Sequence, residues 1–142
     1  MNSGYHQIEL DKSHKERTAF TVGPLGFYEF ERLPMRFCNA PATYRRLMEE
    51  CLGDMHLTIC VIYLDDIIIF SKIYEEHFKN LKKVLTRLRE CGLKLSPNKC
   101  QFFKERVIYV GHVVSEAGVE ADQVKIGKII NWPTPHSPEE VR

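Results

Sequence analysis

The sequence has almost no net charge and no long apolar run. Its 20 lysines and arginines are balanced by 19 acids, which leaves a formal net charge of +1. Global charge therefore indicates no particular partner, and a polyanion such as nucleic acid would have to be held by local basic patches. The lack of a transmembrane run, a signal peptide, a low-complexity tract and an internal repeat predicts an intracellular protein, cytoplasmic or nuclear, without membrane association.

The cysteines lack the spacing of a metal site. None belongs to a CxxC pair, and none has a histidine partner at zinc-finger spacing. They are expected to be reduced thiols, several of them filling the core. The five positions are Cys38, Cys51, Cys60, Cys91 and Cys100.

The chain contains enough apolar residues for one folded domain. Hydrophobic residues make up 44% of the 142 positions, which fits a globular protein rather than a disordered one. Alternating apolar residues predict strands at 5–10, 17–22, 27–33 and 107–114, and a strand, a turn and another strand over 93–103. Helical periodicity predicts helices at 42–52, 74–91 and 122–131. The predicted fold class is α+β, with one antiparallel sheet that carries helices on one face and has the 57–71 hairpin at its centre.

The first two predicted helices have clear end signals. Asn39 is a good N-cap candidate, and Pro41 lies just inside the start, where its missing N–H does no harm. Gly53 is a plausible stop for the first helix, and Gly92 fits the position just after the second.

Both helices have an apolar stripe and a basic face. The stripes comprise Tyr44, Leu47, Met48 and Cys51 in the first helix and Phe78, Leu81, Leu85 and Leu88 in the second. Arg45 and Arg46 lie off the first stripe, and lysines and arginines largely occupy the other face of the second helix. Such a face is most often solvated surface, and contact with a nucleic-acid backbone is the alternative.

The segment Tyr63-Leu64-Asp65-Asp66 joins two apolar, β-branched runs, which predicts a hairpin with acids at its tip. Aspartate is an ordinary turn residue, so a purely structural turn explains the pattern. Two ionised carboxylates beside buried strands, however, repel each other and lose hydration, and a divalent cation removes that penalty. Magnesium binds carboxylates together with substrate phosphates, so the same segment is a candidate metal site for phosphoryl chemistry. The pattern alone leaves both interpretations open.

An ordered set of motifs resembles the reverse transcriptase of gypsy-type LTR retrotransposons. The similarity runs nearly from end to end, and the set is far more specific than any one motif. The motifs are Ser3-Gly4-Tyr5-His6-Gln7-Ile8, Thr18-Ala19-Phe20, Tyr28-Glu29-Phe30, Asn39-Ala40-Pro41-Ala42-Thr43, Tyr63-Leu64-Asp65-Asp66, Tyr109-Val110-Gly111-His112 and Asn131-Trp132-Pro133-Thr134-Pro135.

This resemblance implies an RNA-directed DNA polymerase palm that uses two Mg²⁺ ions, or Mn²⁺, and takes an RNA or DNA template-primer and a dNTP. By motif match, Asp65 is the main metal ligand and Asp66 the secondary one. Tyr5 matches the steric gate against a 2′-hydroxyl. Met35 and Arg36 lie at the nucleotide-binding turn.

The resemblance also implies contacts with the primer. Val110 and Gly111 match the hairpin whose backbone holds the primer end. Tyr63 and Leu64 are expected beside the primer terminus and the minor groove of the template-primer.

The chain also departs from the family pattern. The first catalytic aspartate of the family lies just before the position matching Met1, and neither Glu9 nor Asp11 matches it. The fingers, thumb and ribonuclease H regions are not in these 142 residues, which are expected to form a single partial domain, residues 1–142, with a connection starting at about 122. In addition, Arg36 stands where the family has a glycine. The chain alone is therefore expected to be inactive or very weak.

Three other interpretations stay open. A palm of this kind can be a non-catalytic module that binds nucleic acid through its basic residues. It can be an interaction protein that self-associates through an exposed apolar surface, and that surface also predicts marginal stability. It can also be a truncated open reading frame with no selected role.

Overall fold

The computed structural model describes residues 3–134 and residue 137. The chain divides into two compact units, Met1–Cys100 and Gln101–Arg142, which are described separately. The position adjoining the expected aspartate, Met1, lies outside the described residues, as does most of the segment after Thr134. The predicted α+β class with antiparallel strands is confirmed.

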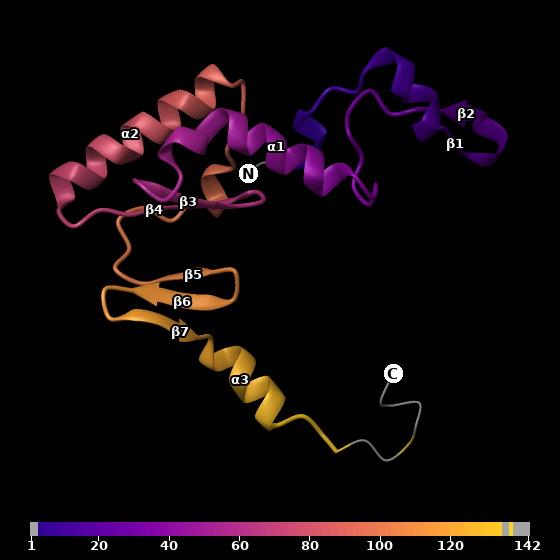
Figure 1. The fold of residues 1–142 in the computed structure, drawn as a ribbon. Helices are drawn as coiled ribbons and strands as arrows, with labels where there is room; N and C mark the ends of the chain where they lie inside the picture. The colour runs from indigo at the N-terminus through magenta and orange to yellow at the C-terminus, as the bar shows by residue number, and fades with distance from the viewer. Residues whose placement is uncertain (1–2, 135–136, 138–142) are drawn as a thin grey trace. The chain divides into compact units, whose positions relative to one another are not determined.

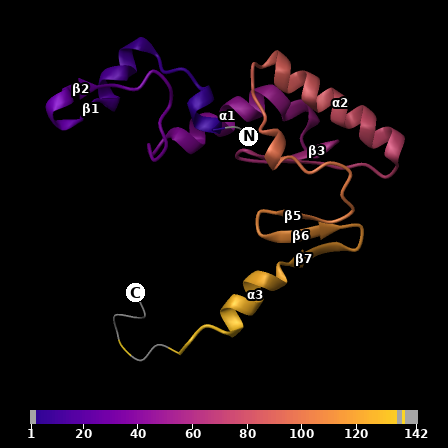
Figure 2. The ribbon, with the colours of Figure 1, turned by 180° about the vertical axis from the view of Figure 1, so that it is seen from behind.

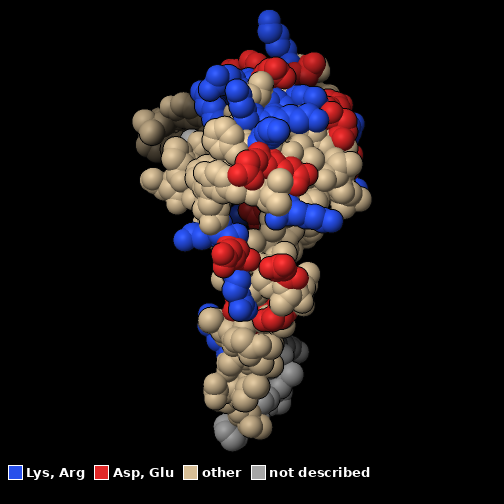
Figure 3. Space-filling view, turned by 90° about the vertical axis from the view of Figure 1, so that its left-hand side faces the viewer, with Lys and Arg blue, Asp and Glu red and all other residues tan. Residues whose placement is uncertain are grey.

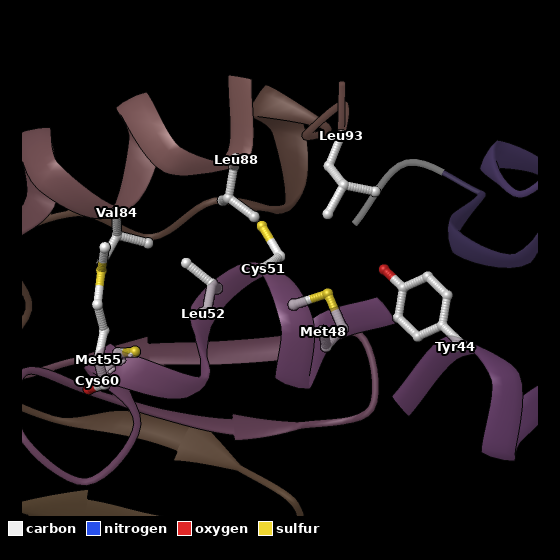
Figure 4. Close-up of a cluster of buried hydrophobic side chains, with 9 residues drawn as sticks. All are labelled: Tyr44, Met48, Cys51, Leu52, Met55, Cys60, Val84, Leu88 and Leu93. Atoms are coloured by element: carbon white, nitrogen blue, oxygen red, sulfur yellow. Dashed lines mark hydrogen bonds between the residues drawn. The ribbon is translucent and has the colours of Figure 1, made fainter. Parts of the chain in front are cut away.

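The centre of the first unit is a hairpin covered by two helices. Strands β3 (Cys60–Tyr63) and β4 (Asp66–Ile69) pair antiparallel, and helices α1 (Ala40–Leu52) and α2 (Tyr74–Glu90) lie on the same side of them (Figures 1 and 2). The interface is apolar (Figure 4). The buried cluster consists of Tyr44, Met48, Cys51, Leu52, Met55, Cys60, Val84, Leu88 and Leu93. The acidic turn is thus carried by the best-packed part of the unit.

Helix α1 forms nearly as predicted. Pro41 lies in its first turn, and the stripe through Tyr44 and Met48 faces the core. Asn39 is at the N-cap position, but its side chain makes no capping hydrogen bond. Its φ of −91° and ψ of −4° place it in the helical region, whereas a capping side chain usually sits on extended backbone.

Helix α2 ends as its glycine predicts. Gly92 has φ +71°, its N–H bonds the carbonyl of Arg89, and the N–H of Leu93 bonds the carbonyl of Leu88 at 2.8 Å. These two bonds form a Schellman motif, in which an apolar contact across the turn is typical, and Leu88 and Leu93 both belong to the buried cluster. The predicted apolar stripe is wrong at Phe78, which is 56% exposed because it lies nearly two turns before the helix reaches the core at Val84.

The strand predicted at 5–10 is wrong. Residues Gly4–Gln7 form a 3₁₀ helix, and only Glu9 makes a bridge, with Arg32. Tyr5 and Ile8 both pack against the buried cluster. A 3₁₀ helix places residues three apart on one side, whereas a strand would place them on opposite faces, so packing overrides the alternation.

The other strands of the first unit are shorter than predicted. The runs at 17–22 and 27–33 pair with each other only over β1 (Phe20–Thr21) and β2 (Phe27–Tyr28). The stretch 93–103 contains no described strand, and Pro97–Lys99 forms a 3₁₀ turn. Proline fixes its own φ and donates no N–H to a ladder, which explains the loss of pairing there.

The second unit is a three-stranded antiparallel sheet followed by a helix. The strands are β5 (Val107–Tyr109), β6 (His112–Ser115) and β7 (Gly118–Ala121), and helix α3 spans Gln123–Ile130. The single strand predicted at 107–114 is wrong, because the chain reverses at Val110 and Gly111. The short helix predicted at 122–131 is confirmed, and the Asp122 side chain accepts a bond from the N–H of Val124 at its start.

The strands form three separate sheets rather than the single sheet expected with the acidic hairpin at its centre. Consequently, β3 and β4 pair only with each other among the described strands. The surface also carries large exposed apolar side chains, including Phe27, Ile130 and Trp132. In the described part of the chain, no helix has the length and apolarity needed to cross a membrane.

Candidate active site

The acidic hairpin has a two-residue turn. Tyr63 pairs with Asp66, so Leu64 and Asp65 are the two central residues of the turn. Leu64 has φ +51°, whereas Asp65 does not have a positive φ. A positive φ at the first central residue alone is the sign pattern of a type II′ turn, where glycine is usual. A left-handed leucine costs roughly 1–2 kcal/mol, which the paired strands on either side must offset.

The turn presents two neighbouring carboxylates to solvent. Asp65 lies in the turn, Asp66 is the first residue of β4, and both are exposed, whereas Ile67 to Ile69 are partly buried. The expected loss of hydration at the carboxylates is therefore wrong, since burial stops at the strands. Two carboxylates suit a hard cation such as magnesium, which takes its remaining ligands from water and substrate.

These two acids do not form a complete metal cage. Within residues 3–134, no group of three or more histidine, cysteine or acidic side chains could hold a metal ion. Neither Glu9 nor Asp11 completes such a group, and Asp11 instead accepts bonds from the N–H and hydroxyl of Ser13. The Ser13 bonds hold the pKa of Asp11 below its usual value.

Two aromatic rings stack beside the start of α1. The rings of Tyr5 and Tyr44 meet edge to face, with centroids 5.4 Å apart. A Cβ at Gly4 would lie 3.1 Å from the Tyr44 ring and hydroxyl, so this approach leaves little space for a side chain. Tyr44 is 1% exposed, and its hydroxyl has no hydrogen-bond partner among the described residues. Tyr5, the expected steric gate, is thus held by a buried partner.

The Tyr44 phenol is electrostatically linked to the acidic turn. Burial raises the pKa of Tyr44 far above its ordinary value of 10.0, and the charge of Asp65 contributes next. Tyr44 therefore stays a neutral phenol at physiological pH. The structure brings Tyr5, Tyr44 and Asp65 into one neighbourhood, although their sequence positions are far apart.

The turn at the expected nucleotide-binding position has a left-handed residue. Arg36 has φ +71°, and both Met35 and Arg36 are exposed. Glycine adopts this backbone without a Cβ penalty, so the geometry fits the glycine that the resemblance places here. The arginine side chain is not buried in the fold of the first unit.

The expected primer-contacting hairpin lies in the second unit. Val110 and Gly111 connect β5 to β6 with φ +49° and +80°, the sign pattern of a type I′ turn. The φ of Gly111 favours glycine, whereas a Cβ there would meet only the mobile amine end of the Lys125 side chain. The predicted hairpin geometry is present, while its contact with a primer stays a prediction.

Two residues of this neighbourhood were missed by sequence reasoning. Tyr44 was assigned only to the apolar stripe of α1, and nothing in the spacing distinguishes its hydroxyl from an ordinary core edge. Gly4 precedes Tyr5 directly, and a glycine beside a candidate site residue is the signal that could have indicated close packing.

Comparison with known proteins places these features in a family. Residues 1–114 match the family described as "Reverse transcriptase (RNA-dependent DNA polymerase)". The retrovirus-related Pol polyprotein from transposon 297 of Drosophila melanogaster is 39% identical over 139 residues, and that from transposon gypsy of the same organism is 38% identical over 142. The two matches cover 98% and 100% of this chain, which spans 13% and 14% of those polyproteins.

The fold is also similar to solved structures. The foamy viral protease-reverse transcriptase in complex with dsDNA aligns with a TM-score of 0.86 and 27% identity, over 97% of this chain and 28% of that one. The same viral protein in complex with an RNA/DNA hybrid also gives a TM-score of 0.86 and covers 97% of this chain and 18% of that one.

Proposed function

We propose, because this chain belongs to the reverse transcriptase family, that it is the palm segment of an RNA-directed DNA polymerase of an LTR retrotransposon. In this proposal the chain holds divalent metal, Mg²⁺ or Mn²⁺, at Asp65 and Asp66 for two-metal nucleotidyl transfer. The observation that carries the proposal is the tight turn that presents both carboxylates to solvent on a hairpin packed against the buried cluster.

The metal ions would supply charge neutralisation at the reacting phosphates and activation of the primer 3′-hydroxyl. The residues of this chain would position the reactants. Asp65 and Asp66 offer carboxylate oxygens from adjacent backbone positions, and the ring of Tyr5 is held edge to face by Tyr44. A ring fixed in this way is suited to contact the sugar of an incoming dNTP, since positioning groups act best when their own orientation is locked.

The remaining residues are proposed as substrate contacts. The turn of Met35 and Arg36 would line the nucleotide site, and the exposed side chain of Tyr63 would lie beside the primer terminus, with Leu64 next to it. The strained turns support this assignment, because left-handed non-glycine residues are found preferentially at functional sites.

We further propose that these 142 residues do not polymerise by themselves. Two carboxylates cannot hold two magnesium ions at fixed positions, and the described residues contain no third acid beside them. Loss of even an outer partner of a metal typically costs 10–100-fold in affinity or activity. The chain spans 13–14% of the curated relatives it matches, and in those proteins further segments accompany it.

Metal binding by the chain can be tested without polymerase activity. Mn²⁺ is added to the isotope-labelled chain, and paramagnetic broadening of its amide signals is followed by NMR. We expect selective broadening at residues 63–66 that disappears in Asp65→Asn and persists in Glu116→Gln, which also removes one exposed carboxylate. Equal broadening in all three proteins would contradict metal binding at this hairpin.

Activity is tested by primer extension on a poly-rA/oligo-dT duplex with Mg²⁺ or Mn²⁺. The 142 residues alone are expected to give no extension above the Asp65→Asn variant. A longer protein that adds the flanking segments of the polyprotein relatives is expected to extend the primer and to lose this activity on Asp65→Asn. Extension by the longer Asp65→Asn protein at the unsubstituted rate would refute the catalytic assignment.

A second function, non-catalytic binding of nucleic acid, is favoured by the basic surface of α2. Lys79, Lys82, Lys83 and Arg87 line a shallow hollow of about 430 Å³, and Figure 3 shows Lys and Arg side chains gathered on this face. Arg87 pairs with Asp54, whereas none of the three lysines has an ion-pair partner among the described residues. Three unpaired cations on one face can replace counterions on a phosphate backbone.

The two functions differ in their salt and mutation dependence. Fluorescence anisotropy with a labelled RNA/DNA duplex measures binding across a salt series. Binding that weakens steeply with salt, is lost in the Lys79→Glu, Lys82→Glu double variant and survives Asp65→Asn supports the basic surface. No binding at low salt would exclude this second function.

A further inference from the structure

Cys51 and Cys91 meet where α1 and α2 end. The thiol of Cys51, at the end of α1, donates to the backbone carbonyl of Arg87 at 3.8 Å. The backbone N–H of Cys91, which caps α2, donates to the same carbonyl at 2.9 Å. One oxygen therefore bonds both residues, and the Cys91 thiol is close enough to Cys51 to raise its pKa.

A network around the two residues keeps them in place. The Arg87 guanidinium donates to the backbone carbonyl of Cys51 at 3.1 Å and to both carboxylate oxygens of Asp54, at 2.9 and 3.2 Å. Cys51 is 3% exposed, and Figure 4 shows its sulfur pointing from α1 towards Leu88 of α2. The approach is thus a feature of packed helices and not of a loose surface loop.

The two thiols differ in access to solvent. Cys91 is exposed and Cys51 is buried, and both are free thiols in the structure. A pair of one exposed and one buried thiol resembles the arrangement in which an accessible cysteine reacts first and a neighbour then resolves it. Cys38 is exposed as well, but no described contact brings it to another cysteine.

We propose that Cys51 and Cys91 are an oxidation site that closes to a disulfide joining the end of α1 to the end of α2. The oxidant is a low-molecular-weight disulfide such as oxidised glutathione. The Cys91 thiolate attacks one sulfur of the oxidant, forms a mixed disulfide and releases one glutathione thiolate. The Cys51 thiolate then attacks the Cys91 sulfur and releases the second glutathione thiolate. Overall, the two protein thiols lose two protons and two electrons, and the oxidant is reduced to two thiols.

The second step is the slow one near neutral pH. Burial, with smaller contributions from the neighbouring Cys91 thiol and from Asp54 and against the lowering effect of Arg87, raises the pKa of Cys51 to about 12. Few Cys51 molecules are thiolates at neutral pH, so closure is expected to accelerate about tenfold for each pH unit of increase.

Closure would constrain the segment that carries the acidic turn. The chain between Cys51 and Cys91 contains β3, Asp65, Asp66 and β4, as well as the whole of α2. A disulfide over a segment of this length is expected to raise the melting temperature on the order of 10 °C. This inference does not depend on the proposed polymerase function, because it concerns only the packing of the two helices.

The test uses the purified, fully reduced chain. It is incubated with oxidised glutathione at mildly alkaline pH, free thiols are blocked by alkylation, and tryptic peptides are mapped by mass spectrometry. We expect two of the five thiols to be lost to a Cys51–Cys91 linked peptide, together with a higher melting temperature that a reductant reverses.

Two sets of variants control the result. Cys38→Ser combined with Cys100→Ser retains the pair and is expected to behave as the unsubstituted chain. Cys51→Ser is expected to stop at a glutathione adduct on Cys91, with no rise in melting temperature. The proposal is overturned if Cys91 of the unsubstituted chain only accumulates the adduct, or if linked peptides contain Cys38 or Cys100 in place of the pair.

Discussion

Replacing Tyr44 with phenylalanine is expected to stabilise the protein. The Tyr44 hydroxyl is buried without a hydrogen-bond partner among the described residues, and the ring itself packs in the apolar cluster and against Tyr5. A buried polar group left unsatisfied costs about 1–3 kcal/mol, whereas Tyr44→Phe removes the oxygen and keeps the ring. The gain should therefore be about 1–2 kcal/mol, after allowance for the small void that the lost atom leaves.

The pH dependence gives this prediction a second signature. Because the pKa of Tyr44 is raised in the folded chain, the unfolded chain releases the phenol proton first, near its ordinary pKa of 10.0. The stability of the unsubstituted chain consequently falls as pH rises above about 10, by up to about 1.4 kcal/mol per pH unit from this group. The Tyr44→Phe protein lacks this loss, so its advantage should widen at alkaline pH.

The assay is urea unfolding followed by circular dichroism at neutral and alkaline pH. Tyr28→Phe is the matched control, because Tyr28 is 47% exposed and loses a hydroxyl that water can solvate. It should change the free energy of unfolding by less than about 0.5 kcal/mol. A Tyr44→Phe protein that is less stable than the unsubstituted chain at neutral pH would refute the reasoning, since the hydroxyl would then have a stabilising partner.

Three further substitutions test the backbone and the charges. Gly92→Ala should lower the free energy of unfolding by about 1 kcal/mol, because Gly92 has a φ of +71°. The control Gly53→Ala, on helical backbone, should be neutral or slightly stabilising. A similar loss for both variants would contradict the Schellman geometry. Arg36→Gly should raise the melting temperature by a few degrees, since it removes a left-handed side chain worth about 1 kcal/mol, and a lower melting temperature would show that the arginine makes stabilising contacts. Arg87→Met should reduce the loss of stability in acid, because Arg87 lowers the pKa of Asp54 below its ordinary 3.8. The stabilisation from this ion pair is present above that pH and disappears as pH falls through the folded pKa. Thermal melts from pH 2 to 6 measure it, and an equal fall of melting temperature with pH in both proteins would mean that the pair contributes nothing.

The helices could be predicted from sequence because their signals are local. In α2, an apolar stripe and a terminal glycine lie within one continuous segment, and the glycine forms the motif that its position indicates. The 3.6-residue period and the φ > 0 preference of glycine need no distant partner. The error at Phe78 concerns where along the helix the core begins, which depends on the neighbouring elements.

The strands were harder to predict because pairing is not local. Residues 5–10 alternate in hydrophobicity, yet Tyr5 and Ile8 both contact the helical cluster, which a 3₁₀ helix allows and a straight strand does not. Alternation shows that a segment can form a strand, but the edge that would pair with it lies elsewhere in the chain. The run at 107–114 was misjudged for a related reason, since a Val-Gly turn is a weaker hairpin signal than Asn-Gly.

The candidate site was predictable only through the resemblance. Pattern alone left the acidic turn open between an ordinary hairpin tip and a metal site, and the exposed carboxylates do not carry the desolvation penalty that the sequence argument assumed. The ordered motifs identified the family, and the match over residues 1–114 confirms it. The buried Tyr44 beside Tyr5 became visible only when α1 and the N-terminal turn were brought together in three dimensions.

Backbone strain connects the fold to the proposed site. Six described non-glycine residues have a positive φ, and three of them, Arg36, Leu64 and Val110, lie at the turns proposed to contact nucleotide or primer. Turn geometry alone would favour glycine at each position, because a larger residue costs roughly 1–2 kcal/mol there. At Leu64 and Val110 the side chain lies at a hairpin tip, where the proposed contact with a bound duplex would help the paired strands to offset that cost. At Arg36 the side chain is exposed and the turn gains nothing from it, so the arginine has no explanation within the fold. If the Arg36→Gly protein is more stable, the left-handed backbone at Arg36 is a cost that no contact of this residue offsets. Leu64 and Val110 would then be the two strained positions whose backbone is explained by the proposed contacts.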